Sequence, residues 1–375
     1  MPIKDSVTSW FIQNIVLPNA EDIRNPGYIL SKFTDQGKNI ALREFFFPEK
    51  FYADLETRIV KKLGKAGEKR LYSIGKRFGY RYAMISRYPK AGAIGAKKTD
   101  EFMYMFTRYI EVVYARQLSH RIEPQKKLLE LEGDSYAGCS RNGIGYLLLN
   151  GAWTGVWSFI SDDNAIDGIQ PACQGRGDPK CRLLCAPNPL LKKMGFSPLT
   201  EPDMGGLEED YGKYDMLNAV HPTSNNNHSL RTLIEAGIFR YERGKLFFDD
   251  ARMVGIEFSM YYLIDNGFSN DAKTREILYG AAFDSGREIS SGKDVTFVQR
   301  FLSGIGFGDV QVIVAANRYR VLFFHFPWAS FAKGCRFTIL SGFASGLLSG
   351  ASGKKVSLKR FSMSEAQDGY HVKID

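Results

Sequence analysis

One short sequence pattern occurs twice in this chain, about 190 residues apart. Residues 149–158 read LNGAWTGVWS and residues 340–349 read LSGFASGLLS, so both fit L-[NS]-G-x-x-[ST]-G followed by two apolar residues and a serine. A cysteine stands upstream of each copy, at positions 139 and 335. Recurrence of this kind indicates a duplicated unit. The alternative is a chance likeness between two glycine-rich buried helices, because short motifs recur in unrelated chains.

The residues around the two copies follow a similar order of predicted elements. Apolar residues at helical spacing predict helices at 51–65, 69–86 and 99–109, and again at 249–266, 271–291 and 295–305. Alternating apolar residues predict strands at 110–116, 127–132, 309–315, 319–326, 356–360 and 370–374. We therefore expect an α+β fold of two tandem repeats, each with a helical layer packed on an antiparallel sheet around a glycine-rich central helix.

The two repeats divide the chain into four segments. We expect an N-terminal arm at 1–38, a first domain at 39–190, a linker at 191–243 and a second domain at 244–375. The linker contains prolines, Gly-Gly and a run of asparagines, which are typical of turns and loops. Each predicted domain is long enough to bury a core of its own.

Charge and apolar stretches limit where this chain acts. Its 375 residues include 50 Lys and Arg against 41 Asp and Glu, a formal charge of +9 that permits an anionic partner without demanding nucleic acid. Residues 142–161 and 337–353 carry no charge, yet their many small and polar residues argue against a membrane span. The first residues, MPIKDSVTSWFIQ, lack the apolar core of a signal peptide. We expect a cytoplasmic protein.

Three of the five cysteines lie within thirteen residues, in the stretch QPACQGRGDPKCRLLC at 170–185. A hairpin at its Gly-Arg-Gly-Asp-Pro segment would bring Cys173 and Cys181 together, and Cys139 could add a thiol from a distance. Thiolates suit tetrahedral Zn²⁺. We therefore predict a structural zinc site from Cys139, Cys173, Cys181 and Cys185. The alternative is a set of ordinary reduced cysteines.

Cys185 fits this site only if the chain bends after Cys181. Four residues of straight strand span about 13 Å, whereas two thiolates on one zinc ion lie about 4 Å apart. Either the strand bends there, or the fourth ligand is another group.

The cysteine stretch and the glycine-rich helix together resemble the 4-vinyl-reductase-type domain. Domains of this small-molecule-binding family occur in bacteriochlorophyll biosynthesis proteins and as sensors of aromatic-responsive transcription activators, and they are related in fold to TRAPP-type subunits of vesicle-tethering complexes. The family pattern is a cysteine before a G-x-x-x-G helix, then E-x-x-C, seven residues and a second cysteine. Gly151, Gly155, Cys173 and Cys181 match this pattern, with Gln170 at the glutamate position.

The resemblance covers residues 38–185 and, at the level of topology, residues 244–375. It implies a zinc site built from the upstream cysteine, the glutamate and the two spaced cysteines. Gln170 is neutral and a poor zinc ligand, so Cys185 is a candidate to replace the lost carboxylate. At its closing positions the second copy has Arg360, Met363 and His371. We therefore expect the second copy to be degenerate and metal-free.

The resemblance also implies a function: binding of a small hydrophobic or aromatic ligand beneath the glycine-rich helix, as a sensor or carrier that acts through a protein partner or a homodimer. The sequence shows no paired carboxylates, catalytic triad or redox cofactor motif, so an enzyme is not expected. Two alternatives are a structural or scaffold subunit of a larger assembly and an accessory protein of tetrapyrrole metabolism. Basic stretches such as Lys76-Arg77 fit solvated helix faces, and no DNA-reading helix-turn-helix accompanies them.

Overall fold

The computed structural model describes residues 3–17, 21–35, 38–139, 145–199, 220, 223, 228–315, 318–326, 336–366 and 369–375. These residues form two compact units. Unit 1 lies within residues 1–18, 52–211 and 243–245, and unit 2 lies within residues 19–51, 212–242 and 246–375. Cys335 and part of the predicted linker fall outside the described residues. The domain boundaries expected from the sequence stay predictions.

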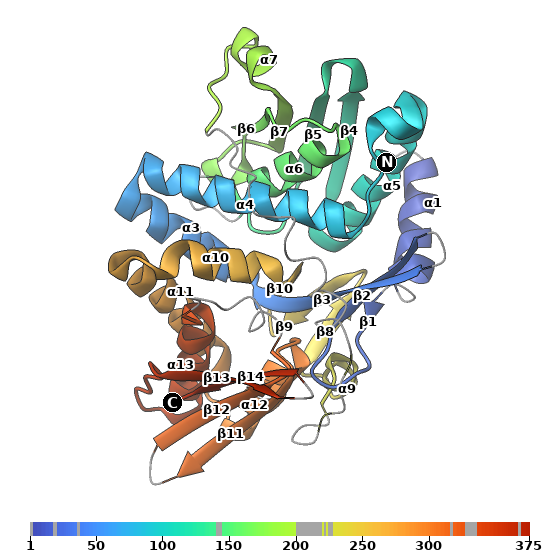
Figure 1. The fold of residues 1–375 in the computed structure, drawn as a ribbon. Helices are drawn as coiled ribbons and strands as arrows, with labels where there is room; N and C mark the ends of the chain where they lie inside the picture. Colours follow the sequence, from blue (N-terminus) through green and yellow to red (C-terminus); the bar gives the residue numbers. More distant parts are fainter. Residues whose placement is uncertain are drawn as a thin grey trace. The chain divides into compact units, whose positions relative to one another are not determined.

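Unit 1 combines helices with a four-stranded antiparallel sheet (Figure 1). Its helices are α1 (Ile3–Phe11), η1 (Ile12–Val16), α3 (Glu49–Leu63, in unit 1 from Tyr52 on), α4 (Lys65–Ile85), α5 (Ala91–Tyr114), η2 (Pro124–Lys126), α6 (Leu147–Ile160), η3 (Gln174–Arg176) and α7 (Asn188–Lys193). Its strands are β4 (Gln117–Glu123), β5 (Leu128–Asp134), β6 (Ile166–Ala172) and β7 (Cys181–Pro187), in the order β4-β5-β7-β6. Helix α6 packs on α4 and contacts β6 and β7, so it lies between the helical layer and the sheet.

Unit 2 repeats this order of elements. They are α10 (Ser259–Ser269), α11 (Ala272–Ser290), α12 (Val295–Gly304), β11 (Asp309–Ala315), β12 (Arg318–Phe324), α13 (Thr338–Ser352), β13 (Phe361–Ala366) and β14 (Gly369–Ile374). The strand order β11-β12-β14-β13 corresponds to that of unit 1, and α13 packs on α11 as α6 packs on α4. The predicted α+β fold with two repeats is confirmed.

A second sheet joins the start of the chain to unit 2. Its strands, in the order β1-β2-β3-β10-β9-β8, are β1 (Glu21–Asp22), β2 (Leu30–Asp35), β3 (Lys38–Pro48), β10 (Ala251–Glu257), β9 (Lys245–Phe248) and β8 (Phe239–Glu242), and α9 (Leu230–Glu235) precedes β8. The fully buried rings of Phe45 and Phe47 lie 4.6 Å from Phe307 and 4.7 Å from Phe343, between ring centroids. Residues 19–51 therefore contribute to the core of unit 2, although they precede most of unit 1 in the sequence.

Glycines let the central helices approach their neighbours closely. A Cβ at Gly151 on α6 would lie 2.1 Å from the carbonyl oxygen of Tyr72 on α4. In unit 2, a Cβ at Gly346 on α13 would lie 2.0 Å from the carbonyl oxygen of Phe283 on α11. No side chain fits at such distances, so the repeated glycine motif encodes a helix–helix contact. In the described part of the chain, no helix is both long and apolar enough to cross a membrane.

A buried carboxylate caps the start of each central helix. Glu56 on α3 accepts the backbone N–H groups of Leu147 and Leu148 at 3.3 and 2.8 Å. Asp265 on α10 accepts the N–H group of Thr338, the first residue of α13, at 3.1 Å. The first N–H groups of a helix have no partner within the helix, so these carboxylates satisfy donors that burial would otherwise leave unpaired.

Three segments differ from the sequence prediction. Residues 110–114, predicted as part of a strand, continue α5, and Val112 is buried there against Ile12 and Leu17. Tertiary packing thus overrides the strand preference of the β-branched residues. Residues 249–258, predicted as helix, form turns and β10, and the predicted strand at 356–360 has no regular structure because β13 begins at Phe361.

Candidate metal centre and ligand cavity

Three thiols converge at one end of the sheet in unit 1. Cys139 follows β5, Cys173 follows β6 and Cys181 begins β7. The Sγ atom of Cys139 lies 3.6 Å from that of Cys173 and 3.0 Å from that of Cys181, and the three sulfur atoms lie within 4.8 Å of one another. Asp178 stabilises the intervening hairpin, because its carboxylate accepts the N–H group of Cys173 at 2.7 Å. The structure therefore brings together three of the four predicted cysteines.

Cys185 does not join this group. Its Sγ atom lies 3.6 Å from the hydroxyl oxygen of Thr154 on α6, and burial raises the pKa of its thiol to about 12. Strand β7 pairs with β5 in unbroken register from Cys181 to Cys185. Four residues of extended strand therefore separate the two side chains, and the bend that would bring them together is absent from this described strand.

The clustered thiols differ in their readiness to ionise. The hydrogen bond between Cys139 and Cys173 lowers the pKa of the Cys173 thiol to about 3 and raises the pKa of the Cys139 thiol. A buried anion is stabilised when neighbouring groups donate hydrogen bonds to it. Because the thiolate is the form that binds metal ions, Cys173 is prepared for coordination.

The donor set fits a soft or borderline metal ion such as Zn²⁺. Two thiolates bound to one zinc ion lie about 4 Å apart, which is close to the separations seen here. Gln170, at the position of the family glutamate, uses its Oε1 atom to accept the N–H group of Tyr146 at 2.9 Å. Three thiols, without a carboxylate, are therefore the metal ligands that the described residues offer.

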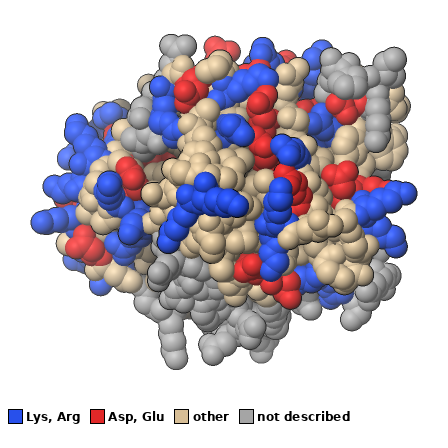
Figure 2. Space-filling view, turned by 90° about the horizontal axis from the view of Figure 1, so that it is seen from above, with Lys and Arg blue, Asp and Glu red and all other residues tan. Residues whose placement is uncertain are grey.

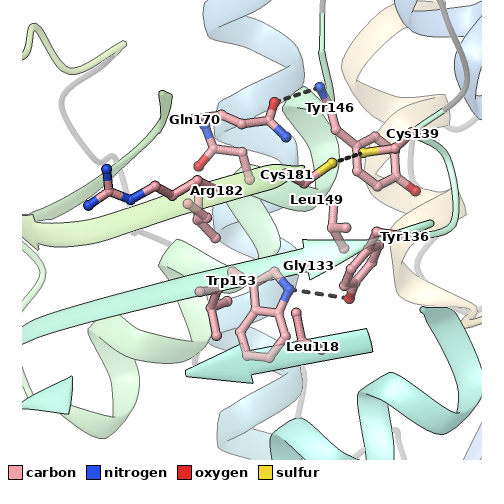
Figure 3. Close-up of a pocket in the computed structure, with 13 residues that line it drawn as sticks. Leu118, Gly133, Tyr136, Cys139, Tyr146, Leu149, Trp153, Gln170, Cys181 and Arg182 are labelled. Atoms are coloured by element: carbon pink, nitrogen blue, oxygen red, sulfur yellow. Dashed lines mark hydrogen bonds between the residues drawn. The ribbon is translucent and has the colours of Figure 1, made fainter. Parts of the chain in front are cut away.

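An apolar cavity of about 30 Å³ adjoins the three thiols, between α6 and strands β4, β5 and β7 (Figure 3). It is lined by Leu118, Leu131, Gly133, Tyr136, Cys139, Tyr146, Leu149, Asn150, Trp153, Gln170, Cys181, Arg182 and Leu183. The indole N–H group of Trp153 donates to the Tyr136 hydroxyl at 3.3 Å, which leaves the ring itself for apolar contacts. Cys139 and Cys181 belong to both the thiol cluster and the cavity wall.

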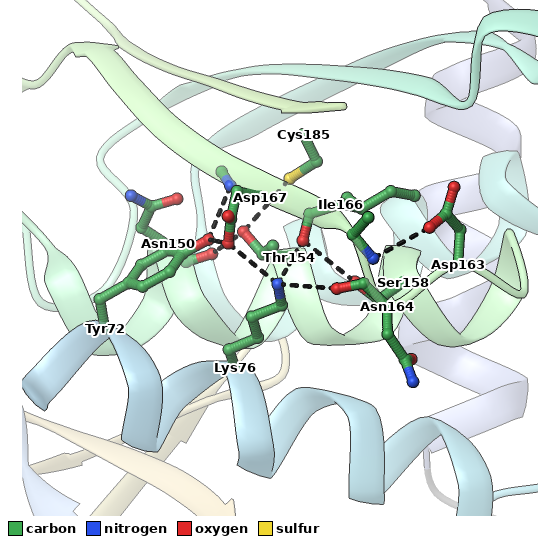
Figure 4. Close-up of polar contacts among 12 residues, drawn as sticks. Tyr72, Lys76, Asn150, Thr154, Ser158, Asp163, Asn164, Ile166, Asp167 and Cys185 are labelled. Atoms are coloured by element: carbon green, nitrogen blue, oxygen red, sulfur yellow. Dashed lines mark hydrogen bonds and ion pairs between the residues drawn. The ribbon is translucent and has the colours of Figure 1, made fainter. Parts of the chain in front are cut away.

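A buried polar network connects α4, α6 and β6 (Figure 4). The Nζ atom of Lys76 lies 2.9 Å from Oδ1 of Asp167, and the Tyr72 hydroxyl donates to the same oxygen at 3.0 Å. Lys76 also donates to the carbonyl oxygen of Ile166. Burial lowers the pKa of Lys76, although Asp167 opposes this shift. The network fixes the start of β6, the strand that leads to Cys173.

Sequence reasoning missed this network, because it placed Lys76 on a solvated helix face. Spacing on the helix could have identified it. Tyr72, Lys76 and Gly79 are four and three residues apart, so they share one face of α4. A Cβ at Gly79 would lie 1.8 Å from the carbonyl oxygen of Ala152, which shows that this face packs directly on α6. A lysine on such a face is buried.

The closing positions of unit 2 carry different groups. His371 on β14 accepts the N–H group of His325 at 3.4 Å, and the two imidazole rings lie 5.4 Å apart. Met363 on β13 is exposed, as is Arg360. Cys335 lies outside the described residues. The described positions thus do not reproduce the arrangement of Cys139, Cys173 and Cys181.

Comparison with known proteins assigns no family. No protein-family model matches the sequence, and no curated protein matches it. Among solved structures, the chain is similar to the phenol-responsive sensory domain of the transcription activator PoxR with phenol, at a TM-score of 0.36 and 15% identity, covering 54% of this chain and 100% of that one. So low a TM-score supports no inference about function, which has to be argued from this chain's own residues.

Proposed function

We propose that this chain binds a small hydrophobic or aromatic molecule in the cavity of unit 1 without transforming it, as a sensor or carrier of the 4-vinyl-reductase type. The position of the cavity carries this proposal, because Leu118, Leu149 and Trp153 enclose an apolar space beneath the glycine-rich helix. Burying apolar ligand surface there contributes about 25 cal/mol per Å². Since the cavity measures about 30 Å³, a ring-sized ligand would enter by displacing Leu149, whose side chain is only partly buried.

A zinc ion held by Cys139, Cys173 and Cys181 would support this cavity. The three residues belong to the segment after β5 and to the hairpin between β6 and β7. Metal binding would tie these two segments together, and such binding free energy adds directly to folding free energy. The sulfur separations and the lowered pKa of Cys173 support this assignment.

The chemistry of the cavity wall favours binding over catalysis. Among the described residues that line it, none is His, Asp or Glu, the side chains that most often transfer protons in active sites. The polar groups of the wall serve the protein itself, since Gln170 bonds the backbone of Tyr146 and Tyr136 bonds Trp153. The remaining wall is suited to apolar contact.

A scaffold role is the second candidate, and one observation favours it. The N-terminal helical segment exposes four large apolar side chains, Val7, Trp10, Phe11 and Ile15. Their spacing places them on one helical face, while Ile12 and Leu17 pack on Val112. Exposed apolar faces of this kind mark interaction sites. The same face would serve a protein partner or homodimer through which a sensor acts.

The charge of the chain does not single out nucleic acid as a partner. Figure 2 shows Lys and Arg interspersed with Asp and Glu over much of the face in view. Several basic side chains are paired, for example Lys127 with Asp163 at 2.8 Å and Lys90 with Asp162 at 2.7 Å. Mixed charge lacks the single-sign surface that phosphate binding uses.

Native mass spectrometry of the protein purified from its own host tests this function. We expect one zinc ion per chain and a retained small apolar molecule. Leu149→Trp fills the cavity and should remove the molecule but keep the zinc. Val314→Trp, at an exposed strand position, is the matched control. Recovery of zinc without any small molecule, together with a complex containing other proteins, would favour the scaffold role instead.

A further inference from the structure

The metal centre of unit 1 has an incomplete set of protein ligands. The group formed by Cys139, Cys173 and Cys181 contains three donors, and no other described His, Cys, Asp or Glu lies within it. Structural zinc sites are closed by four protein ligands, whereas sites with three keep a position for an external ligand. The arrangement here belongs to the second kind.

The nearest candidates for a fourth protein ligand are engaged elsewhere. Gln170 offers only an amide, and its oxygen accepts the N–H group of Tyr146 (Figure 3). Cys185 contacts Thr154. The carboxylate of Glu56 accepts two N–H groups at the start of α6. None of these can turn to the thiols without leaving a buried group unsatisfied.

The thiol cluster shares a wall with the apolar cavity. Cys139 and Cys181 line the cavity together with Leu149 and Trp153. A molecule in the cavity therefore meets apolar side chains and the metal-binding sulfur atoms at once. Soft thiolate sites favour soft donors, and an apolar wall favours an aromatic or aliphatic body.

From this geometry we infer that the ligand itself completes the metal centre: it is a small apolar thiol, whose sulfur, as thiolate, occupies the position that Gln170 leaves open. This inference rests on the proposed function, which it narrows to one ligand class. It also gives the glutamine a purpose, because a glutamate at that position would close the site.

Cobalt(II) in place of zinc makes this coordination visible. The intact protein is loaded with cobalt and titrated with benzenethiol, phenol and toluene, which have nearly the same size and differ in the donor group. We expect thiolate-to-cobalt charge transfer of three-thiolate intensity, and ligand-field bands that change saturably with benzenethiol but not with phenol or toluene. Ligand binding to the cavity is followed in parallel by calorimetry.

Gln170→Glu supplies a carboxylate that can still accept the Tyr146 N–H group. It should keep cobalt but respond to benzenethiol at least about tenfold more weakly. Gln117→Glu, an exposed change of the same type on β4, should behave as the unmodified protein. Circular dichroism confirms that both variants fold.

Three results would overturn the inference: an unchanged cobalt spectrum with benzenethiol, an equal response in Gln170→Glu, or a starting spectrum of four thiolates. If toluene binds by calorimetry while benzenethiol leaves the spectrum unchanged, the inference falls and the proposed ligand-binding function stands. If the protein takes up no cobalt, both the inference and the metal part of the proposed function fall.

Discussion

Lys76 on α4 and Asp167 on β6 form an ion pair inside unit 1, with 2.9 Å between Nζ and Oδ1 and exposed side-chain fractions of 1% and 0%. Tyr72 donates a further hydrogen bond to the same carboxylate oxygen. A buried charge that loses its partner keeps its desolvation cost. The pair therefore fixes the position of β6 on the helical layer, and with it the strand end that carries Cys173.

Breaking this pair should be costly. Lys76→Met leaves the Asp167 carboxylate buried without a cation, and we expect it to lower the free energy of unfolding by about 3–5 kcal/mol. Adding Asp167→Asn should recover part of this loss, since the amide is neutral. Urea unfolding measures both variants. The control is Lys90→Met, which breaks the exposed pair with Asp162 and should cost at most about 1 kcal/mol; equal costs for Lys76 and Lys90 would contradict the role assigned to the buried pair.

The glycines of the central helices should tolerate no side chain. We expect Gly151→Ala in unit 1 and Gly346→Ala in unit 2 each to lower the free energy of unfolding by about 1–3 kcal/mol, because the new methyl group meets a backbone carbonyl. Gly92→Ala on α5 is the control, since a Cβ there meets nothing within 4 Å. It should be neutral or stabilise by up to about 1 kcal/mol. A Gly151→Ala protein as stable as Gly92→Ala would show that the helices are not held this closely.

How far the sequence predicts this structure depends on the range of the interactions. The repeated glycine motif and the spacing of Cys173 and Cys181 are local patterns, and they predict the central helices and the hairpin of the thiol cluster. The burial of Lys76 depends on a strand about 90 residues away in the sequence. The helical state of Val112 likewise depends on the distant Ile12 and Leu17. Such contacts leave little trace in local periodicity.

Metal content should separate the four predicted cysteines into two groups. Replacing Cys139, Cys173 or Cys181 by serine should abolish zinc binding, because two thiols remain. Cys185→Ala should retain about one zinc ion per chain, since its sulfur contacts Thr154 instead. Elemental analysis of the purified full-length variants decides this. Loss of zinc from Cys185→Ala would mean that the fourth thiol is a ligand after all.

The strand β3 should be essential to unit 2. Phe47→Ala removes a fully buried ring that contacts Phe343, and we expect a loss of about 3–5 kcal/mol. Hydrogen exchange should show lost protection in α13 while α6 of unit 1 stays protected. Phe361→Ala, at an exposed position, serves as the control. Faster exchange in α6 and not in α13 would place β3 in the wrong unit.

The stability of unit 2 should depend on pH through Asp265. Burial raises the pKa of this carboxyl from 3.8 to about 6. The folded protein therefore binds the proton more tightly than the unfolded chain, so stability falls as the pH rises from 3.8 to about 6 and is constant above that range. Asp265→Asn keeps an oxygen for the Thr338 N–H group and should remove this decline. Urea unfolding across that pH range tests it, and an unchanged slope in the variant would assign the decline to another group.

Calorimetric titration of the full-length protein with toluene tests the central claim most directly, because toluene probes the cavity alone and offers the metal no donor. We predict saturable binding of one toluene per chain, with a negative heat-capacity change from buried apolar surface. The binding should be lost in Leu149→Trp and kept in Val314→Trp. No measurable binding to the unmodified protein, or equal binding to the protein with the filled cavity, would contradict the account.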